Sequence, residues 1–578
     1  MAGLTLCSSL LFAVIILGYV SLKCTAGWVD PDTPDDAKEV ISLVDGRTYT
    51  LVGSDEFMES GRKFSPGSDP MWTGTDHSDD SNTGGTLSLG SQQYYNSTML
   101  TTNDGYLNIS TSSDMTKWKG WNPYKHQYEE MNKTFRSGMV TGWNKFCFTG
   151  GKIDIRARLP GKAHTPGLWP AIWMLGNLGR PTFEASTNLV WPWSYNECSL
   201  DKIEAQEINA CLRTRHYGLK PGQGRGATEI DILEAMAGDE KHLGGTPMST
   251  PYFSSTLQLA PGVPKNRPNF GQKPTATQTW YTGMEYGENS TQNVYFYGSD
   301  LGVTSVNEPT MRTAKQAYQA DSVSAVTNVV SDLFDNFHNY GLEWVTGPEG
   351  YIKWYLDDVL IFSVSAPGLK VTGAQIPEEP SYLIFNTAVS SSWGFPLPCP
   401  DGCDCTCFDC NDPSCVCGIP VGMCDMLPAH FLIDYVRVYQ VQNDSSQYTG
   451  CDPIPYPTRR FMHAHKDRYT AKTTDPLTSK LLTGGHTCTS DKECGHGACS
   501  GFAFLKWCKC EEGWHGPNCL VTKKFEETPA AWDVGNTLEF HSIDLPAPFY
   551  IMLVTIAAGV VVSTCFNVRE KQNARVRR

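Results

Sequence analysis

Short apolar runs with a period of two dominate the middle of this chain. Over residues 49–440, aromatic and β-branched residues alternate with polar ones, and turns rich in Gly, Pro, Asn and Asp separate the runs. Long helical periodicity is scarce in this part. The pattern predicts an all-β fold, a β-sandwich with large loop insertions. We expect strands at 151–159, 351–356, 382–386 and 431–439, the last of which closes the sandwich.

Apolar segments at both ends predict entry into the secretory pathway and anchoring in a membrane. Residues 10–20 have the length of a signal-peptide core, which predicts a signal peptide over 1–26. No basic residue precedes that core, so an uncleaved anchor is the alternative. Residues 549–566 are uncharged, long enough to cross a bilayer, and followed by five basic residues. We expect a single-pass type I protein of the secretory pathway or plasma membrane, with 567–578 as a cytosolic tail.

Charge and cysteine content agree with a lumenal or extracellular main domain. The formal net charge is -15, from 61 acidic and 46 basic residues, which argues against nucleic acid as a partner. Of the 21 cysteines, Cys7, Cys24 and Cys565 lie in or beside the apolar ends. The remaining cysteines are even in number and can all pair as disulfides, which is typical of a protein in an oxidising compartment. Five glycosylation sequons support the same route, at Asn96, Asn108, Asn132, Asn289 and Asn443.

The sandwich is expected to occupy 27–445 and to carry a cysteine-rich insertion at 399–424. Eight cysteines fall in this insertion among Asp, Pro and Gly. A metal cluster at Cys403, Cys405, Cys407 and Cys410 is the competing interpretation, but disulfides are favoured in an oxidising lumen. Their pairing is not readable from the sequence. The polar residues 446–487 are interpreted as a linker.

Six further cysteines define a small module at 488–519. They follow the spacing C-x5-C-x4-C-x8-C-x-C-x8-C, with Gly513, Trp514 and Gly516 in the last loop. This pattern resembles an epidermal-growth-factor-like module, a resemblance that implies the disulfides Cys488–Cys499, Cys494–Cys508 and Cys510–Cys519. The acidic calcium-binding pattern of that family is missing before Cys488, so we predict no calcium site in this module. We assign no metal site or cofactor to the rest of the chain, where a remote structural cation stays open. Residues 520–548 are expected to link the module to the membrane segment.

Candidate chemistry is concentrated at 225–238, RGATEIDILEAMAG, where Glu229, Asp231 and Glu234 stand among apolar residues. On an α-helix, at about 100° per residue, the three carboxylates would point in different directions. On a regular strand Glu229 and Asp231 share a face and Glu234 lies on the other. One extra residue in a β-bulge at Ile232 or Leu233 would bring all three to one face. A solvent-exposed acidic strand is the alternative interpretation.

Two carboxylates on one face are what glycoside cleavage requires. One attacks the anomeric carbon, while the other protonates the leaving oxygen and then activates the acceptor. A retaining mechanism places the two carboxyl groups about 5–5.5 Å apart. Asp231 between them would help to keep one carboxyl protonated and the other ionised.

The segment EIDILE resembles the E-x-D-x-x-E signature of glycoside hydrolase family 16. The stretches at 137–151, 167–180, 191–198 and 221–235 resemble its fungal-type β-1,6-glucan synthesis-associated subgroup, over roughly residues 49–440. The resemblance implies a concanavalin-like jelly roll with a substrate cleft, Glu229 as nucleophile and Glu234 as acid/base. It also implies that Trp143, Trp169, Trp173 and Trp393 are candidate sugar platforms. Arg180 and Asn386 are candidates for hydrogen bonds to sugar hydroxyls, and His338 is a weaker one.

The sequence therefore predicts a membrane-anchored, retaining glycosidase or transglycosidase that acts on β-1,3- or β-1,6-glucan during glucan synthesis and cell wall organisation. Whether water or a sugar hydroxyl attacks the intermediate stays open. A non-catalytic glucan-binding or assembly factor is the alternative, since sandwich folds also serve as lectin scaffolds. An adhesion or receptor protein is a third possibility, suggested by the small module on a membrane stalk.

Overall fold

The computed structural model describes residues 28–522, apart from several internal gaps. The gaps are 79–89, 123–126, 188, 198–201, 203–205, 207–218, 221–222, 239–250, 264–265, 302–317, 397–398, 406, 466–467, 471–487, 495–496, 503–504, 513, 516–518 and 520. The predicted signal peptide, membrane segment and cytosolic tail lie outside the described residues. Within them, no helix is both long and apolar enough to span a membrane.

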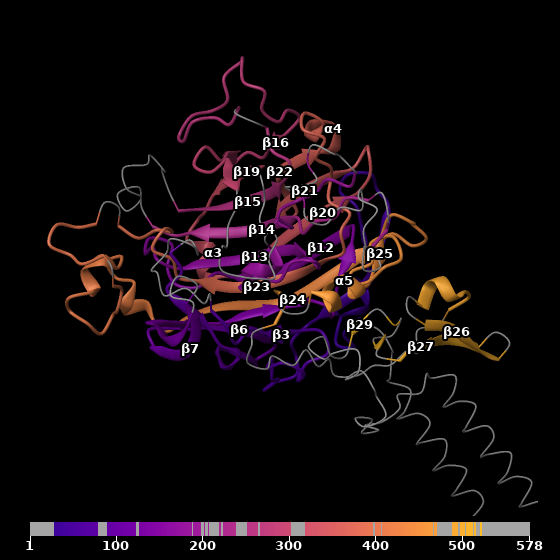
Figure 1. Ribbon diagram of the computed structural model, residues 1–578, viewed down its shortest axis with the longest axis horizontal. Helices are drawn as coiled ribbons and strands as arrows, with labels where there is room; N and C mark the ends of the chain where they lie inside the picture. The colour runs from indigo at the N-terminus through magenta and orange to yellow at the C-terminus, as the bar shows by residue number, and fades with distance from the viewer. Residues whose placement is uncertain are drawn as a thin grey trace, which may run out of the picture.

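Two large β-sheets form the main body (Figure 1). The first has twelve strands, in the path β16-β22-β21-β20-β12-β24-β6-β9-β4, with β1, β2 and β5 paired alongside. Its strands are β1 Glu39–Ile41, β2 Thr48–Asp55, β4 Gln93–Tyr95, β5 Leu100–Asn103, β6 Tyr106–Ser112, β9 Phe135–Ser137, β12 Gly151–Arg158, β16 Glu285–Tyr286, β20 His338–Val345, β21 Tyr351–Leu356, β22 Val359–Ser365 and β24 Ala429–Gln440.

The second sheet has eleven strands and carries the candidate chemistry. Its path is β17-β19-β15-β14-β13-β23-β10-β3, with β11, β18 and β25 paired alongside. The strands are β3 Thr73–Gly74, β10 Met139–Thr141, β11 Phe148–Thr149, β13 Trp169–Gly176, β14 Glu229–Met236, β15 Tyr252–Leu259, β17 Ser290–Gln292, β18 Gly298–Leu301, β19 Tyr318–Asn328, β23 Ser381–Ala388 and β25 Tyr448–Thr449.

The remaining elements are short. Three two-stranded sheets are formed by β7 Thr116–Asn122 with β8 Gln127–Lys133, β26 Gly497–Phe502 with β27 Leu505–Cys510, and β28 Trp514–His515 with β29 Val521–Thr522. The helices are α2 Glu184–Thr187, α3 Asp332–Asp335, α4 Ala366–Leu369 and α5 Arg459–Ala464, and the 3-10 turns are η2 Asp35–Ala37, η3 Ser97–Met99, η5 Val416–Gly418, η6 Cys424–Met426 and η8 Asp491–Cys494.

The predicted all-β sandwich is confirmed, and its core follows from the alternation along the strands. Ile153 and Ile155 of β12 and Ile230 and Leu233 of β14 are buried in one cluster between the sheets. Their polar neighbours point to the opposite faces, as a period of two requires. The four predicted strands correspond to β12, β21, β23 and β24. The last does not close an edge: β24 lies between β12 and β6 and also pairs with β2.

The segment interpreted as a linker, 446–487, needs correction over 448–470. There β25 pairs with β11, and the disulfide Cys147–Cys451 joins positions 304 residues apart. Met462 of α5 and Tyr469 have no exposed surface. Because these side chains complete a hydrophobic cluster on the second sheet, this stretch belongs to the domain.

Disulfides account for both cysteine-rich regions. The insertion at 399–424 contains four, Cys399–Cys405, Cys403–Cys417, Cys407–Cys415 and Cys410–Cys424. The module at 488–519 contains Cys488–Cys499, Cys494–Cys508 and Cys510–Cys519, the pairing that its resemblance implied. All fourteen cysteines of these two regions are therefore used in disulfides, which leaves none of their thiols for a metal.

Candidate active site

A β-bulge in β14 brings the three carboxylates to one face of the second sheet. Opposite β13, Asp231 is aligned with Trp173 and Glu234 with Ala171, and the register shifts between them. Opposite β15, Asp231 is aligned with Thr256 and Glu234 with Ser254, so the two residues Ile232 and Leu233 face one. The bulge predicted from the spacing is confirmed. The carbonyl of Ile232 accepts a hydrogen bond from Ser255 Oγ at 3.0 Å, which satisfies a group that the bulge removes from the ladder.

Glu229 is held by two donors at the start of β14. Trp191 Nε1 donates to Oε2 at 2.7 Å, and Gln258 Nε2 donates to Oε1 at 2.9 Å. Both donors favour the ionised carboxylate. Both also fix the orientation of the side chain, as a nucleophile requires.

Trp191 reaches Glu229 because its loop is fastened to the residues that precede β14. Ala227 N donates to Val190 O at 3.0 Å, and Thr228 Oγ1 donates to Trp193 O at 2.9 Å. Gly226 is required for this approach, since a Cβ there would lie 2.1 Å from the carbonyl oxygen of Trp193.

Asp231 is the most buried of the three carboxyl groups, with 1% of its surface exposed. It hydrogen-bonds Glu229, and Gln258 Nε2 also lies 3.4 Å from its Oδ2. Behind it, Trp354 Nε1 of the first sheet donates to its backbone carbonyl at 2.9 Å. From this position Asp231 can influence the charge and the orientation of the Glu229 carboxylate.

Glu234 lies beyond the bulge among different donors. Trp169 Nε1 lies 3.2 Å from Oε1, and Ser254 Oγ lies 3.4 Å from Oε2. These hydrogen bonds are longer than those to Glu229, so they stabilise an ionised carboxylate less well.

The surroundings give the three carboxyl groups different proton affinities. Burial raises the pKa of Glu229, and hydrogen bonds from Asp231, Trp191 and Gln258 oppose the rise. Burial and then the charges of Glu229 and Glu234 raise the pKa of Asp231 well above its ordinary range. Burial, followed by the charge of Glu229, raises the pKa of Glu234 to about 8. The three groups thus differ in their surroundings: the donors to Glu229 favour its ionised form, whereas a pKa of about 8 keeps Glu234 protonated at neutral pH, as an acid that protonates a leaving oxygen must be.

Two of the predicted sugar platforms, Trp169 and Trp173, share the face of the carboxylates. They lie two positions before and two positions after Ala171 on β13, so their side chains point to the same face as that of Ala171, which is aligned with Glu234. Both indoles are half-buried. Trp173 Nε1 donates to Asn386 Oδ1 at 2.8 Å, and Asn386 Nδ2 donates to the Tyr95 hydroxyl at 3.1 Å. Asn386 therefore positions Trp173 in this structure. Trp393 follows β23 and stacks on Trp169.

Trp143 lies in the buried cluster that Met462 and Tyr469 complete, against which Trp173 and Trp191 also pack, and Arg180 lies over its ring. Trp143 is 2% exposed and stacks on Tyr469, with ring centroids 5.7 Å apart. Arg180 is 6% exposed, lies over Trp143 and donates to Tyr469 O. A sugar platform must present a face to solvent, and a hydrogen-bond donor to sugar must be accessible, so the platform expected at Trp143 and the donor expected at Arg180 are both corrected to packing roles. His338 lies on the first sheet, with its ring nitrogens on Asp357 and Asp332.

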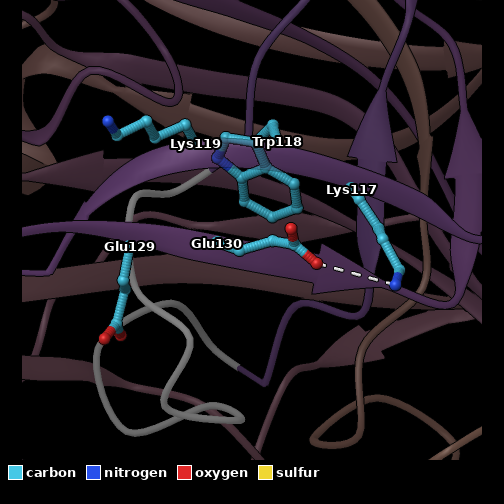
Figure 2. Close-up of a pocket in the computed structure, with 5 residues that line it drawn as sticks. All are labelled: Lys117, Trp118, Lys119, Glu129 and Glu130. Atoms are coloured by element: carbon cyan, nitrogen blue, oxygen red, sulfur yellow. Dashed lines mark ion pairs between the residues drawn. The ribbon is translucent and has the colours of Figure 1, made fainter.

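A separate hollow of about 460 Å³ lies on the β7–β8 hairpin (Figure 2). It is lined by Lys117, Trp118, Lys119, Glu129 and Glu130. Figure 2 shows the Lys117–Glu130 ion pair across the hairpin, at 3.6 Å. None of the three carboxylates of β14 lines this hollow, so it is distinct from the candidate active site.

Comparison of the whole sequence with models of known protein families identifies the family of this chain. The model of the β-glucan synthesis-associated protein family SKN1/KRE6/Sbg1 matches residues 14–397 and 422–482. The chain belongs to this family. The interval between the matched parts, 398–421, nearly coincides with the cysteine-rich insertion. The fungal-type glucan synthesis-associated subgroup expected from the sequence is thereby confirmed.

Relatives within the family are distant and longer. The β-glucan synthesis-associated protein KRE6 of Candida albicans is 30% identical over 459 residues, which cover 76% of this chain and 52% of that protein. KRE6 of Saccharomyces cerevisiae is 30% identical over 464 residues, covering 76% and 53%. The chain thus spans about half the length of these relatives.

Solved structures similar to the chain include an endo-1,3-β-glucanase (laminarinase) catalytic domain from Thermotoga petrophila. It is 19% identical, and the match covers 69% of this chain and all of that one, with a TM-score of 0.35. The endo-β-1,3-glucanase of Pyrococcus furiosus is 18% identical, covering 71% and 98%, with a TM-score of 0.36.

The sequence did not single out Trp191, Gln258 or Ser254. Gln258 and Ser254 are aligned with Glu229 and Glu234 across the β14–β15 ladder. The alternation of polar residues along YFSSTLQL was the available signal, but it identifies donors only once the register with β14 is known.

Proposed function

We propose that this chain is a β-glucan-active retaining glycosidase or transglycosidase that acts in the synthesis of β-1,6- and β-1,3-glucan and in cell wall organisation. The observation that carries the proposal is the bulged strand β14, which gathers Glu229, Asp231 and Glu234 on one face with different proton affinities. Membership of a β-glucan synthesis-associated family supports glucan as the substrate class.

In the first step the carboxylate of Glu229 attacks the anomeric carbon of the bound glucan. The bond from that carbon to the glycosidic oxygen breaks, and the carboxyl proton of Glu234 passes to the departing oxygen. A covalent glycosyl ester on Glu229 and an ionised Glu234 result. A pKa of about 8 keeps Glu234 protonated at neutral pH, so its proton is available for transfer.

In the second step Glu234 acts as a base. It takes a proton from water or from a sugar hydroxyl, whose oxygen attacks the anomeric carbon and displaces Glu229. Water gives a shortened glucan, whereas a sugar acceptor gives a lengthened or branched one. Because the family is associated with glucan synthesis, we favour transfer to a sugar.

Asp231 and Gln258 are positioning residues for the nucleophile. A protonated Asp231 donates a hydrogen bond to Glu229 and adds no negative charge to the site. Gln258 Nε2 contacts both carboxylates and fixes their relative orientation. Both contacts stabilise an ionised Glu229 before attack and a good leaving carboxylate in the second step.

The cellular setting is part of the same proposal. Residues 549–566 would anchor the protein in the plasma membrane or a secretory-pathway membrane, with the sandwich lumenal or extracellular. The disulfides of the insertion and of the module suit that oxidising compartment.

The test is incubation of the purified full-length chain with β-1,3- and β-1,6-gluco-oligosaccharides, with products read by mass. Longer or branched products identify a transglycosidase, and shorter ones alone a hydrolase. Glu229→Gln is expected to lower turnover by roughly 1000-fold or more. The control Glu349→Gln changes an exposed residue before β21 and should keep full activity.

If folded wild-type protein binds glucan and leaves every oligosaccharide unchanged, the enzymatic proposal fails. The non-catalytic glucan-binding or assembly role would then account for the family membership.

A further inference from the structure

A series of aromatic side chains, joined by ring contacts and by one buried apolar cluster, begins at Glu234 and leaves the carboxylates across the sheet. Trp169, which donates to Glu234, stacks on Trp393 with centroids 4.3 Å apart and planes at 8°. Trp393 Nε1 donates to the carbonyl of Ala235 at 3.1 Å, so the pair is fixed to β14 itself. Both indoles are half-buried and therefore retain some accessible surface.

The series continues over β15 toward the edge of the sheet. Tyr252 is 6% exposed and lies 6.4 Å from Trp393, centroid to centroid. Tyr295 packs against the same cluster as Trp393. Phe270 meets Tyr295 edge to face at 5.9 Å and is 65% exposed. The buried cluster of Met236, Tyr252 and Val326 thus lies between two accessible pairs, Trp169–Trp393 and Tyr295–Phe270, one member of each of which packs against it.

These rings lie on the same face as the catalytic carboxylates. Tyr252 is aligned with Met236, two residues after Glu234 on β14. Val326 of β19 is aligned with Ser254, the neighbour of Glu234, and belongs to the cluster that Tyr295 covers. Since aligned residues on neighbouring strands point to the same side, the series runs across the strands and not along one of them.

The outer pair is held in place and is not a free loop tip. Gly271 N donates to Val294 O at 2.7 Å, and the Tyr297 hydroxyl donates to Gln272 O at 2.6 Å. Asn293 accepts from Tyr295 N at 3.0 Å and donates to Ser324 of β19 at 3.2 Å. The described residues 266–301, which carry both rings, lie toward the top of Figure 1. A platform fixed in advance binds a ligand with less loss of conformational entropy.

A single exposed phenylalanine is ordinary on a protein surface and carries no argument. Here Phe270 is one end of a contact series whose other end is the hydrogen-bond partner of Glu234. Flat apolar rings suit the apolar faces of pyranose sugars. The occupant that suits accessible rings on the same face as the carboxylates is the same polymer that they would cleave.

We propose that Phe270 and Tyr295 form a distal glucan-binding surface, which holds sugars of the bound chain several units away from the reacting bond. The inference rests on the proposed function and extends it. Such a surface makes the enzyme selective for long glucan chains, because short oligosaccharides at the carboxylates do not reach it.

The experiment compares kcat/KM of the full-length protein on β-1,3- and β-1,6-glucan polymers with kcat/KM on the shortest oligosaccharide that the wild type processes. Phe270→Ala is expected to lower the value for the polymer by about threefold to tenfold and to leave the short substrate unchanged. Phe270→Trp, which keeps a flat ring, should restore polymer activity. Val359→Ala removes exposed apolar surface from β22 of the other sheet and serves as the control.

Two results would overturn the inference, and they differ. If the wild type processes glucan but Phe270→Ala affects long and short substrates equally, or neither, the distal surface is rejected while the proposed function stands. If the wild type processes no β-glucan at all, the proposed function fails and the distal surface fails with it.

Discussion

At the scale of single residues, the site is defined by how unequally the protein treats three carboxyl groups on one strand. Glu229 accepts two hydrogen bonds shorter than 3 Å, whereas both donors to Glu234 lie beyond 3.1 Å. Asp231 is buried between them and hydrogen-bonded to Glu229. This inequality is what the proposed roles of nucleophile, positioning group and acid require of three chemically similar side chains.

The raised pKa of Glu234 predicts that the folding stability of the protein depends on pH. This pKa rises from the ordinary 4.5 to about 8 on folding. Between those values the unfolded chain ionises while the folded protein keeps its proton, so wild-type stability falls as pH rises. Relative to wild type, Glu234→Gln should gain unfolding free energy from about pH 4.5 to about pH 8 and level off above.

Denaturant unfolding of both proteins at several pH values measures this difference, with Glu349→Gln as the exposed control. A Glu234→Gln difference that stays flat from pH 4.5 to 8 would contradict the raised pKa.

At the scale of elements, the bulge in β14 could be predicted because the spacing of the carboxylates leaves few alternatives. One extra residue at Ile232 or Leu233 is needed to turn Glu234 to the face of Glu229 and Asp231. In the register with β15, these two residues of β14 lie opposite one residue of β15. Trp191 and Gln258 could not be found in the same way. Their contacts with Glu229 depend on a loop and a strand register that local pattern does not determine.

The stretch 448–470 was missed for a related reason. Its composition is polar, and its few core residues, among them Cys451, Met462 and Tyr469, are separated by turns. The partner of Cys451 is 304 positions earlier in the chain, and composition alone cannot reveal such pairing. The same cluster encloses Trp143, which the sequence assigned to the cleft.

The disulfide Cys147–Cys451 should therefore contribute more to stability than its short-range counterparts. It closes a long loop, and replacing both cysteines by serine should lower the unfolding free energy by about 2–4 kcal/mol. The matched control replaces Cys399 and Cys405, which are six positions apart, and should cost less. Equal losses in chemical denaturation would contradict the docking of 448–470 onto the domain.

At the scale of the whole molecule, two sheets enclose one core, and the outer face of the second sheet carries the carboxylates and the aromatic series. The sandwich and its general limits could be predicted from alternation with a period of two. The order of the strands and the central place of β24 could not, because they depend on pairings between distant segments. What the structure adds to the motif is a series of packed aromatic side chains that extends from Glu234 toward the edge of the sheet.

We propose that Glu229 forms a covalent bond with the glucan, and trapping that bond is the most direct test. Full-length protein is incubated with an activated 2-deoxy-2-fluoro β-gluco-oligosaccharide, which slows breakdown of a glycosyl ester, and is then digested and read by mass. We expect a glycosyl adduct on the peptide that contains Glu229, and no adduct in Glu229→Gln. A folded, glucan-binding protein that carries no adduct, or carries it on another residue, would rule out Glu229 as the nucleophile.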